Sequence, residues 1–171
     1  MDRMFVDPRI TIVPGTTQHC RELSLNLRHG DRAEILAVGM SPGKALLNSF
    51  GSSHICEAAI VGGEVAAMWG VCGCFLSNKG IPWLLTSPIV ERYRIHLFRG
   101  AREFIGRCSE EFSVLENYVD ASYGRAIYFL KCLGFQIGEE IPMGPFNAPF
   151  RRFHMSQDMW DHASGLPPWA G

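Results

Sequence analysis

The stretch from Val114 to Phe135, VLENYVDASYGRAIYFLKCLGF, constrains the fold most strongly. Its aromatic and β-branched residues through Val119 predict a buried strand, and Asp120 begins a turn. Apolar residues at helical spacing follow, and Gly134 stands where a left-handed C-cap is needed. The stretch therefore predicts a strand and a helix, with a Leu-Gly-Phe joint that leads into a second strand.

The composition indicates one globular domain. With 171 residues, 47% of them hydrophobic, the chain is long enough for a single core. The formal net charge is −1, so no basic excess suggests a nucleic-acid surface. No apolar run approaches the roughly 20 residues that a membrane span needs, and the N-terminal residues lack the apolar region of a signal peptide. We therefore expect a cytoplasmic protein that binds neither nucleic acid nor membrane.

The 6 cysteines indicate reduced thiols rather than a metal site. They are scattered in apolar contexts, and none of them has the C-x-x-C spacing that is common among metal ligands. Cys72 and Cys74 are separated by one residue on an expected strand, so both point to one face. We expect free cysteines in a reducing compartment and no bound metal.

Hydrophobic periodicity and turn residues predict the remaining elements. Gly62-Gly63 is the expected two-residue turn of a β-hairpin, and Ser41-Pro42 is an expected helix start. Helices around a mostly antiparallel sheet predict an α+β fold, with one domain over residues 1–155 and a loosely docked tail over residues 156–171. The expected strands cover residues 9–13, 55–61, 65–71, 81–86, 114–119, 135–141 and 150–155, and helices are expected near residues 17–27, 31–38, 42–48, 95–105 and 123–133.

Three charged residues, Arg28, Asp31 and Glu34, follow one another at steps of three. If residues 31–38 are helical, Asp31 and Glu34 share a face and Arg28 lies near its start. A solvated charged face would explain this spacing equally well.

The predicted order of elements, with its Leu-Gly-Phe joint, resembles the GNAT superfamily of acetyl-CoA-dependent N-acetyltransferases from Arg9 to Met155. Several segments are also similar to a GNAT-like family encoded by bacteriophages, some of whose members are internal virion proteins. These segments are LRHGDRAEI, ALLNSFGSS, the pair IPWLL and HLFRGAREFI, LENYVDASYGRAIYFLKCLGF, and IPMGPFNAPFRRFHM.

The resemblance implies a place for acetyl-CoA. In GNAT proteins the strand equivalent to Trp83–Thr86 splays from the strand equivalent to Leu115–Val119, and the pantetheine lies in the gap as an added strand would. The pyrophosphate binds at the N-terminus of the next helix, which here begins between residues 89 and 95. An oxyanion contact would come from backbone N–H near Leu85. The implied cofactor contacts are Leu84, Leu85, Thr86, Arg92, Arg94 and Ile95.

Two positions depart from the family pattern. The glycine-rich Q/R-x-x-G-x-G/A loop is replaced by residues 91–96, ERYRIH. Arg92 and Arg94 could hold phosphate through their side chains, or they could be ordinary surface cations. The family tyrosine that protonates the CoA thiolate is Leu130 here, and Tyr123 occupies a position where asparagine is common. The hydroxyl of Tyr123 is therefore a candidate for either role, with a core or rim tyrosine as the alternative.

The general base that would deprotonate an amine has four candidates: Glu34, Glu116, Asp120 and His54. Glu34 lies in the region that borders the acceptor mouth in GNAT folds, and Asp120 ends the strand along the cofactor gap. Burial would raise the pKa of either carboxyl group and make it a better base.

The resemblance implies an N-acetyltransferase that moves acetyl directly from acetyl-CoA to an amine on a protein or a small molecule, with a protein favoured. The alternative is a catalytically degenerate GNAT-fold protein with a structural role in a virion or an interaction with a host protein.

Overall fold

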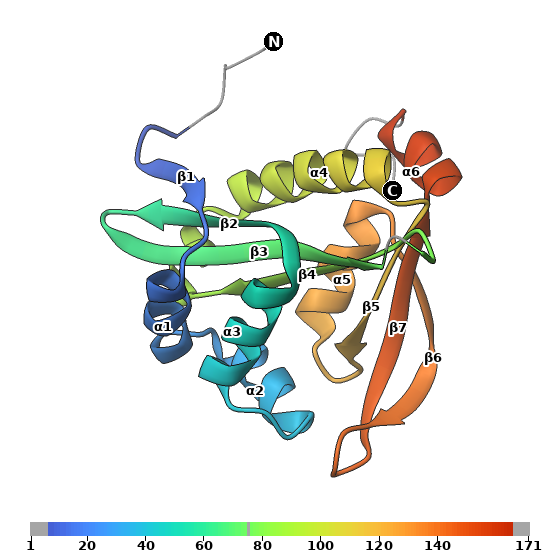
Figure 1. Cartoon of the computed structure of the whole chain (residues 1–171), viewed down its shortest axis with the longest axis horizontal. Coiled ribbons are helices and arrows are strands. Elements are labelled where there is room, and N and C mark those ends of the chain that lie inside the picture. Colours follow the sequence, from blue (N-terminus) through green and yellow to red (C-terminus); the bar gives the residue numbers. More distant parts are fainter. Residues whose placement is uncertain (1–6, 75, 166–171) are drawn as a thin grey trace.

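A single mixed sheet organises residues 7–74 and 76–165, the part of the chain that the computed structural model describes (Figure 1). The strands are β1 (Ile10–Pro14), β2 (Ser53–Val61), β3 (Glu64–Cys74), β4 (Lys79–Thr86), β5 (Val114–Asp120), β6 (Gln136–Met143) and β7 (Ala148–Ser156). They form a 7-stranded sheet of order β1-β2-β3-β4-β5-β7-β6. The predicted α+β fold is confirmed.

The helices lie on both faces of this sheet. They are α1 (Thr17–Leu25), α2 (His29–Ala37), α3 (Pro42–Ser52), α4 (Arg94–Glu111), α5 (Gly124–Leu133) and α6 (Gln157–Ser164), with a 3₁₀ turn η1 (Pro88–Arg92) before α4. Sequence signals set several of their ends. The side chains of Thr16 and Ser41 cap α1 and α3, and Gly134 ends α5 with φ +101°.

Strands β4 and β5 are the one parallel pair, and they separate almost at once. Their pairing covers Lys79 with Val114 and Gly80 with Leu115, and it ends there. All other neighbouring strands pair antiparallel over longer stretches. The predicted splay between the two central strands is therefore confirmed.

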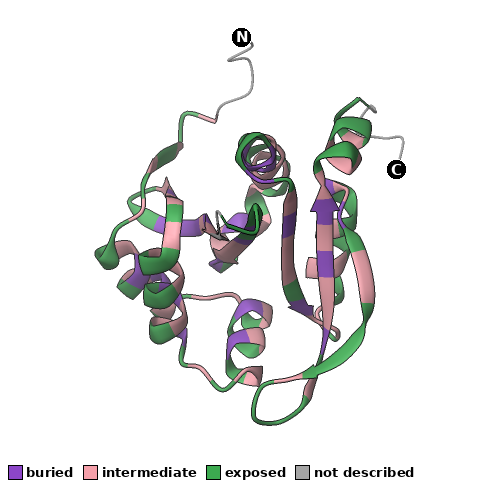
Figure 2. Ribbon diagram, turned by 45° about the vertical axis from the view of Figure 1, so that its right-hand side comes forward, coloured by how far each residue is buried: buried purple, intermediate pink, exposed green. Residues whose placement is uncertain are grey.

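The apolar core is divided between the two faces of the sheet, and buried positions lie both on the strands and on the helices that cover them (Figure 2). On one face, Leu23 of α1 and Leu46 of α3 pack with Met68 of β3. On the other, Phe104 of α4 and Leu133 of α5 pack with the β5–β7–β6 part of the sheet. Strand β4 borders the first of these clusters through Trp83 and Leu85, and through Leu84 it borders a third cluster that includes Val90, so its two faces meet different surroundings.

Two segments differ from the sequence analysis. Residues 49–53, expected as a loop, continue α3 to Ser52 and begin β2, with the Ser53 hydroxyl donating to the Ser49 carbonyl at 2.6 Å. Part of the expected tail is α6, whose Trp160 lies against Gly106 and under Arg102 of α4. Such a short helix depends on packing rather than on its own propensity. Residues 166–171 lie outside the described part.

The described cysteines Cys20, Cys56, Cys72, Cys108 and Cys132 are free thiols. Within the described ranges, no three His, Cys, Asp or Glu side chains are grouped as metal ligands would be. None of the described helices is long and apolar enough to cross a membrane.

Candidate functional site

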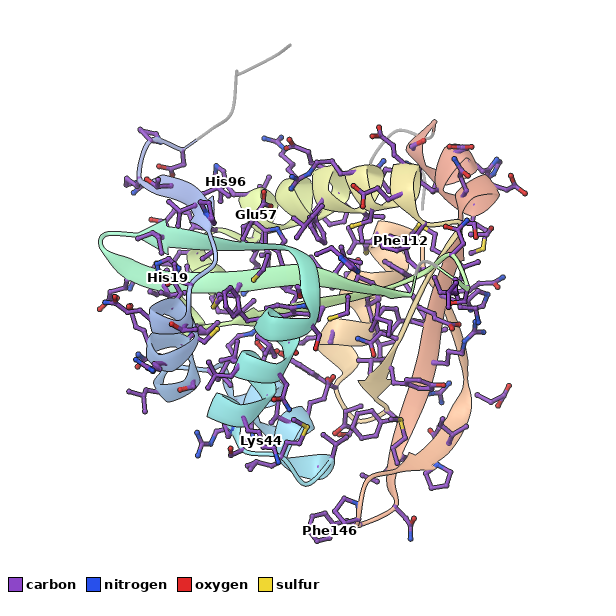
Figure 3. The ribbon with its side chains drawn as sticks, viewed as in Figure 1. His19, Lys44, Glu57, His96, Phe112 and Phe146 are labelled. Atoms are coloured by element: carbon purple, nitrogen blue, oxygen red, sulfur yellow. The ribbon has the colours of Figure 1, made fainter. Side chains whose placement is uncertain are left out.

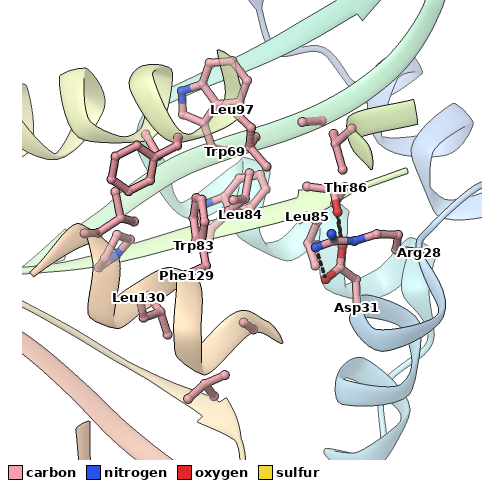
Figure 4. Close-up of a pocket in the computed structure, with 18 of the residues that line it drawn as sticks. Arg28, Asp31, Trp69, Trp83, Leu84, Leu85, Thr86, Leu97, Phe129 and Leu130 are labelled. Carbon is pink, nitrogen blue, oxygen red and sulfur yellow. Dashed lines mark hydrogen bonds and ion pairs between the residues drawn. The ribbon is translucent and has the colours of Figure 1, made fainter. Parts of the chain in front are cut away.

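The gap between β4 and β5 opens into a cavity of about 1090 Å³ (Figure 4). Its walls come from α2, β4, η1, α4, β5 and α5. Of the residues predicted from the sequence, six line it, namely Glu34, Leu84, Leu85, Thr86, Arg94 and Tyr123. Arg92, Ile95 and Asp120 lie outside this lining, and Ile95 is 65% exposed.

The direction of the β4 backbone follows from the contacts at its end. The Thr86 N–H donates to Asp31 Oδ2 at 2.8 Å, and the Thr86 carbonyl accepts from the Arg28 N–H at 2.8 Å, so both groups point away from β3. Hydrogen-bonded and non-hydrogen-bonded positions alternate along an antiparallel pair. Leu84 therefore also faces the gap, while Leu85, paired with Met68, faces β3.

Three gap-facing positions of β4 then differ in what they offer. Pro82 has no N–H, and its carbonyl accepts from Asn117 Nδ2 at 3.0 Å. Thr86 is engaged by α2. Leu84 keeps both its N–H and its carbonyl open to the gap, because the ladder to β5 ends at Gly80. Within residues 82–86, Leu84 is thus the position where an added strand could hydrogen-bond.

Asn117 bridges the two strands where they part, a role that the sequence analysis missed. Its side-chain nitrogen binds the Pro82 carbonyl of β4, and its Oδ1 accepts from the Tyr118 N–H of β5 at 2.8 Å. One amide thereby satisfies a backbone group on each strand. The available signal was Pro82, a proline inside an expected strand. Because proline has no N–H, it cannot donate a hydrogen bond to the neighbouring strand at this position.

Asp31 fastens α2 to the end of β4. It is 6% exposed and accepts hydrogen bonds from the N–H and hydroxyl of Thr86 and from the Tyr123 hydroxyl at 2.9 Å. The Arg28 guanidinium lies 3.7 Å away. A solvated face is therefore wrong for Asp31, since its oxygens are buried and hydrogen-bonded.

Gly30 makes room for this contact. A Cβ at this position would lie 2.3 Å from two ring atoms of Tyr123. Burial, and then the charge of Asp31, raises the pKa of Tyr123, so its hydroxyl is held protonated as a donor to Asp31.

Glu34 lies one turn further along α2 and faces β5. It is half-buried and accepts a hydrogen bond from the Asp120 backbone. Burial chiefly, with the charges of Asp31 and Asp120, raises its pKa to about 8, although that hydrogen bond opposes the shift. Asp31 and Glu34 therefore bracket the gap, one at the end of each strand.

The other candidate bases are engaged elsewhere. The Asp120 carboxylate caps its own turn, accepting from the Ser122 N–H at 2.8 Å and the Ser122 hydroxyl at 2.7 Å. Arg152, followed by Lys79, lowers the pKa of Glu116, which makes it a weaker base. The His54 ring lies 3.4 Å from the Gly73 carbonyl at the opposite end of the sheet.

A second charged cluster lies at the start of α4. Glu91 of η1 contacts Arg28 at 3.1 Å, Arg94 at 2.9 Å and Arg125 of α5 at 3.1 Å. The Arg28 hydrogen bond is the main cause that lowers the pKa of Glu91. Three guanidinium groups from three elements thus surround one carboxylate, and the Arg28 Nε, which is buried, has no acceptor within the described residues. Of these three arginines, only Arg94 was predicted from the sequence as a phosphate ligand.

Comparisons with solved structures agree with this architecture. No protein-family model matches the sequence, and no curated protein is significantly similar to it. A GCN5-related N-acetyltransferase from Brucella melitensis superposes with TM-score 0.68 at 12% identity, over 93% of this chain and 80% of that chain. The fold is that of the GCN5-related N-acetyltransferases.

A second neighbour is the spermidine N-acetyltransferase from Vibrio cholerae in complex with CoA and spermine. It superposes with TM-score 0.66 at 8% identity, over 90% of this chain and 99% of that chain. At such identities the likeness extends to the fold, and the similarity to a bacteriophage-encoded family remains a prediction.

Asp31 gives a test of the bracket. Replacing Asp31 by Ala leaves the buried Thr86 N–H and the Tyr123 hydroxyl without an acceptor, so we expect unfolding free energy to fall by about 2–4 kcal/mol. Asp31→Asn keeps one acceptor oxygen and should cost less. Urea denaturation measures both, with exposed Asp161→Ala on α6 as the control, expected within about 0.5 kcal/mol of the unmodified chain. Equal effects of Asp31→Ala and Asp161→Ala on the unfolding free energy would mean that Asp31 does not hold α2 to the end of β4.

Proposed function

We propose that this protein is an acetyl-CoA-dependent N-acetyltransferase that transfers acetyl directly to a primary amine. The observation that carries the proposal is the open backbone of Leu84, which faces a large cavity between two splayed strands. The fold shared with N-acetyltransferases, one of them in complex with CoA, supports it.

The pantetheine arm would lie along β4 as an added strand. One of its amide N–H groups would pair with the carbonyl of Leu84, which leaves the Leu84 N–H for the thioester oxygen, and apolar side chains such as Leu97 and Phe129 would cover the arm. This geometry moves the expected oxyanion contact from Leu85 to Leu84, because the N–H of Leu85 is directed to β3.

The phosphates of CoA would bind at the start of α4 through side chains. Arginine side chains form strong, charge-assisted hydrogen bonds to phosphate. Arg28, Arg94 and Arg125 already converge there on Glu91, with a net charge of about +2 by formal count. Arg92 lies outside the cavity lining, so of the two arginines expected from the sequence only Arg94 enters the proposal.

The chemical step follows from these positions. Glu34 takes a proton from the ammonium form of the acceptor, and the neutral amine attacks the thioester carbonyl. The C–N bond forms while the oxyanion accepts a hydrogen bond from the Leu84 N–H. The C–S bond then breaks, the attacking nitrogen gives up its second proton to water, and the CoA thiolate leaves and takes up a proton from water. Tyr123 enters as a positioning residue, because its proton is engaged by Asp31.

A catalytically degenerate protein of the same fold is the second candidate. The missing family glycines, at the positions of Arg94 and His96, and the missing family tyrosine, at Leu130, favour it. A protein acceptor, a virion or host partner and bacteriophage origin rest on the resemblance alone, and a cytoplasmic location rests on the composition of the sequence. All of these stay predictions.

Calorimetric titration with CoA tests the phosphate site. Loss of two charge-assisted contacts at roughly 1.5–3 kcal/mol each should weaken CoA binding about a hundredfold or more in the double variant Arg94→Ala and Arg125→Ala. Arg92→Ala is the matched control, since Arg92 is exposed and outside the lining. Unchanged CoA affinity in the double variant would exclude this phosphate site, and absence of CoA and acetyl-CoA binding by the unmodified chain would exclude the enzyme.

Glu34→Gln tests the base. Because Glu34 acts when deprotonated and its pKa is raised to about 8, the rate of acetyl transfer should rise with pH through about 8. The Gln variant should lose this rise and about 10²–10⁴ in rate, with acetyl-CoA affinity nearly unchanged. An undiminished rate of acetyl transfer in the Gln variant would exclude Glu34 as the general base.

The same variant has a signature in stability. The folded chain holds a proton on Glu34 that the unfolded chain releases near the ordinary pKa of 4.5. The protonated Glu34 therefore contributes stability to the folded chain that is fully present below pH 4.5 and is lost as the pH rises from there through about 8. Urea denaturation of the Gln variant should show a weaker decline of stability across that window, and an identical decline would mean that the pKa is not raised.

A further inference from the structure

The part of the cavity that α2, α3 and the β6–β7 hairpin line, which we call the second compartment, has mostly apolar walls. Trp83 forms one wall, and its ring nitrogen is engaged by the Ser53 hydroxyl at 2.8 Å, so the ring itself is what the compartment meets. Most of the other lining side chains are apolar. They include Ile35, Val38, Ala45, Met143 and Phe150.

The tip of the β6–β7 hairpin bounds this compartment. A Cβ at Gly144 would lie 2.8 Å from the Ala37 carbonyl, and a Cβ at Gly39 would lie 2.7 Å from Pro145 Cγ. Both glycines have positive φ, which lets the two loops meet at this distance. Phe146 points outward at the same tip and is 74% exposed (Figure 3). The hairpin therefore contacts the α2–α3 connection and limits how far an acceptor can extend.

The charges on this side are few. Among the described lining residues of α2 and α3, the carboxylates are Asp31 and Glu34. Asp31 is already bound by Thr86, Tyr123 and Arg28. Glu34 is the remaining carboxylate of this lining, and Asp120, whose charge also acts on Glu34, lies outside the lining and is bound by Ser122. One ammonium group can therefore find an anionic partner here. A second ammonium group would be buried without one, which is strongly unfavourable.

We propose that the acceptor is a primary amine on a compact apolar body, and that polyamines are excluded. This proposal rests on the proposed acetyltransferase function and deepens it. The amine lies at Glu34, between the two strands, and the apolar body packs between Trp83 and Met143. A free arylalkylamine and a lysine side chain in a peptide share this chemistry. This chain and the spermidine N-acetyltransferase neighbour would then share a fold but not a substrate.

Direct binding of three probes tests the proposal on the full chain. Saturation-transfer NMR titrations would use 2-phenylethylamine, a short peptide with one lysine, and spermidine, each with and without saturating CoA. We expect 2-phenylethylamine, the lysine peptide or both to bind at least about tenfold more tightly than spermidine, and the tighter of the first two shows which source supplies the amine. Spermidine binding as tight as the better of the other two, or no binding of any amine, would overturn the proposal.

A pair of variants on β6 localises the site. Met143→Glu adds a carboxylate to the compartment, so it should weaken 2-phenylethylamine binding about tenfold and strengthen spermidine binding. Ile141→Glu is the matched control, because Ile141 lies two residues away on the same strand, is 37% exposed and is outside the lining. Equal effects of the two variants would overturn the assignment of this compartment. If CoA does not bind in the calorimetric titration, the proposed function is excluded, but the amine-binding results can still be interpreted.

Discussion

Beyond Gly80, strands β4 and β5 leave backbone groups unpaired inside the fold, and the rest of the site depends on how these groups are satisfied. A buried N–H or carbonyl without a partner costs about as much as a lost hydrogen bond. Side chains satisfy several of these groups. Asn117 binds one group on each strand, Asp31 accepts from the Thr86 N–H, and Glu34 accepts from the Asp120 N–H. Leu84 is left between them. The gap is thus held open at both ends, with the Leu84 position of β4 free for a ligand.

In the same arrangement, the surroundings of two carboxylates shift their pKa values in opposite directions. Glu91, surrounded by Arg28, Arg94 and Arg125, has a lowered pKa and stays ionised. Glu34, buried beside two other acidic residues, has a pKa raised to about 8. Opposite shifts are expected where one group organises cations for an anionic ligand and the other exchanges a proton. Arg28 joins the two regions, since its backbone binds Thr86 and its side chain binds Glu91.

Much of the fold could be predicted because local signals repeat across the chain. Gly62-Gly63 marked the hairpin, Gly134 marked the end of α5, and the splay between β4 and β5 followed from the resemblance. The site was harder, because its contacts join residues far apart in sequence. Glu34 was predicted from its spacing from Arg28 and from the resemblance, and it lines the cavity. Neither periodicity nor motif spacing reports that Asn117 faces Pro82. The oxyanion contact expected near Leu85 moves to Leu84 in the proposal, because the direction of the β4 backbone becomes known only from the Thr86 contacts.

The central claim, that the Leu84 backbone receives the ligand, can be measured by amide hydrogen exchange on the full chain. In the free protein the Leu84 amide should exchange rapidly, whereas the Leu85 amide should be protected by its pairing with β3. Saturating acetyl-CoA should protect Leu84 by about tenfold or more and leave Leu85 nearly unchanged. If acetyl-CoA binds and the Leu84 amide exchanges as rapidly as before, the ligand does not pair with β4 and the account of this gap is wrong.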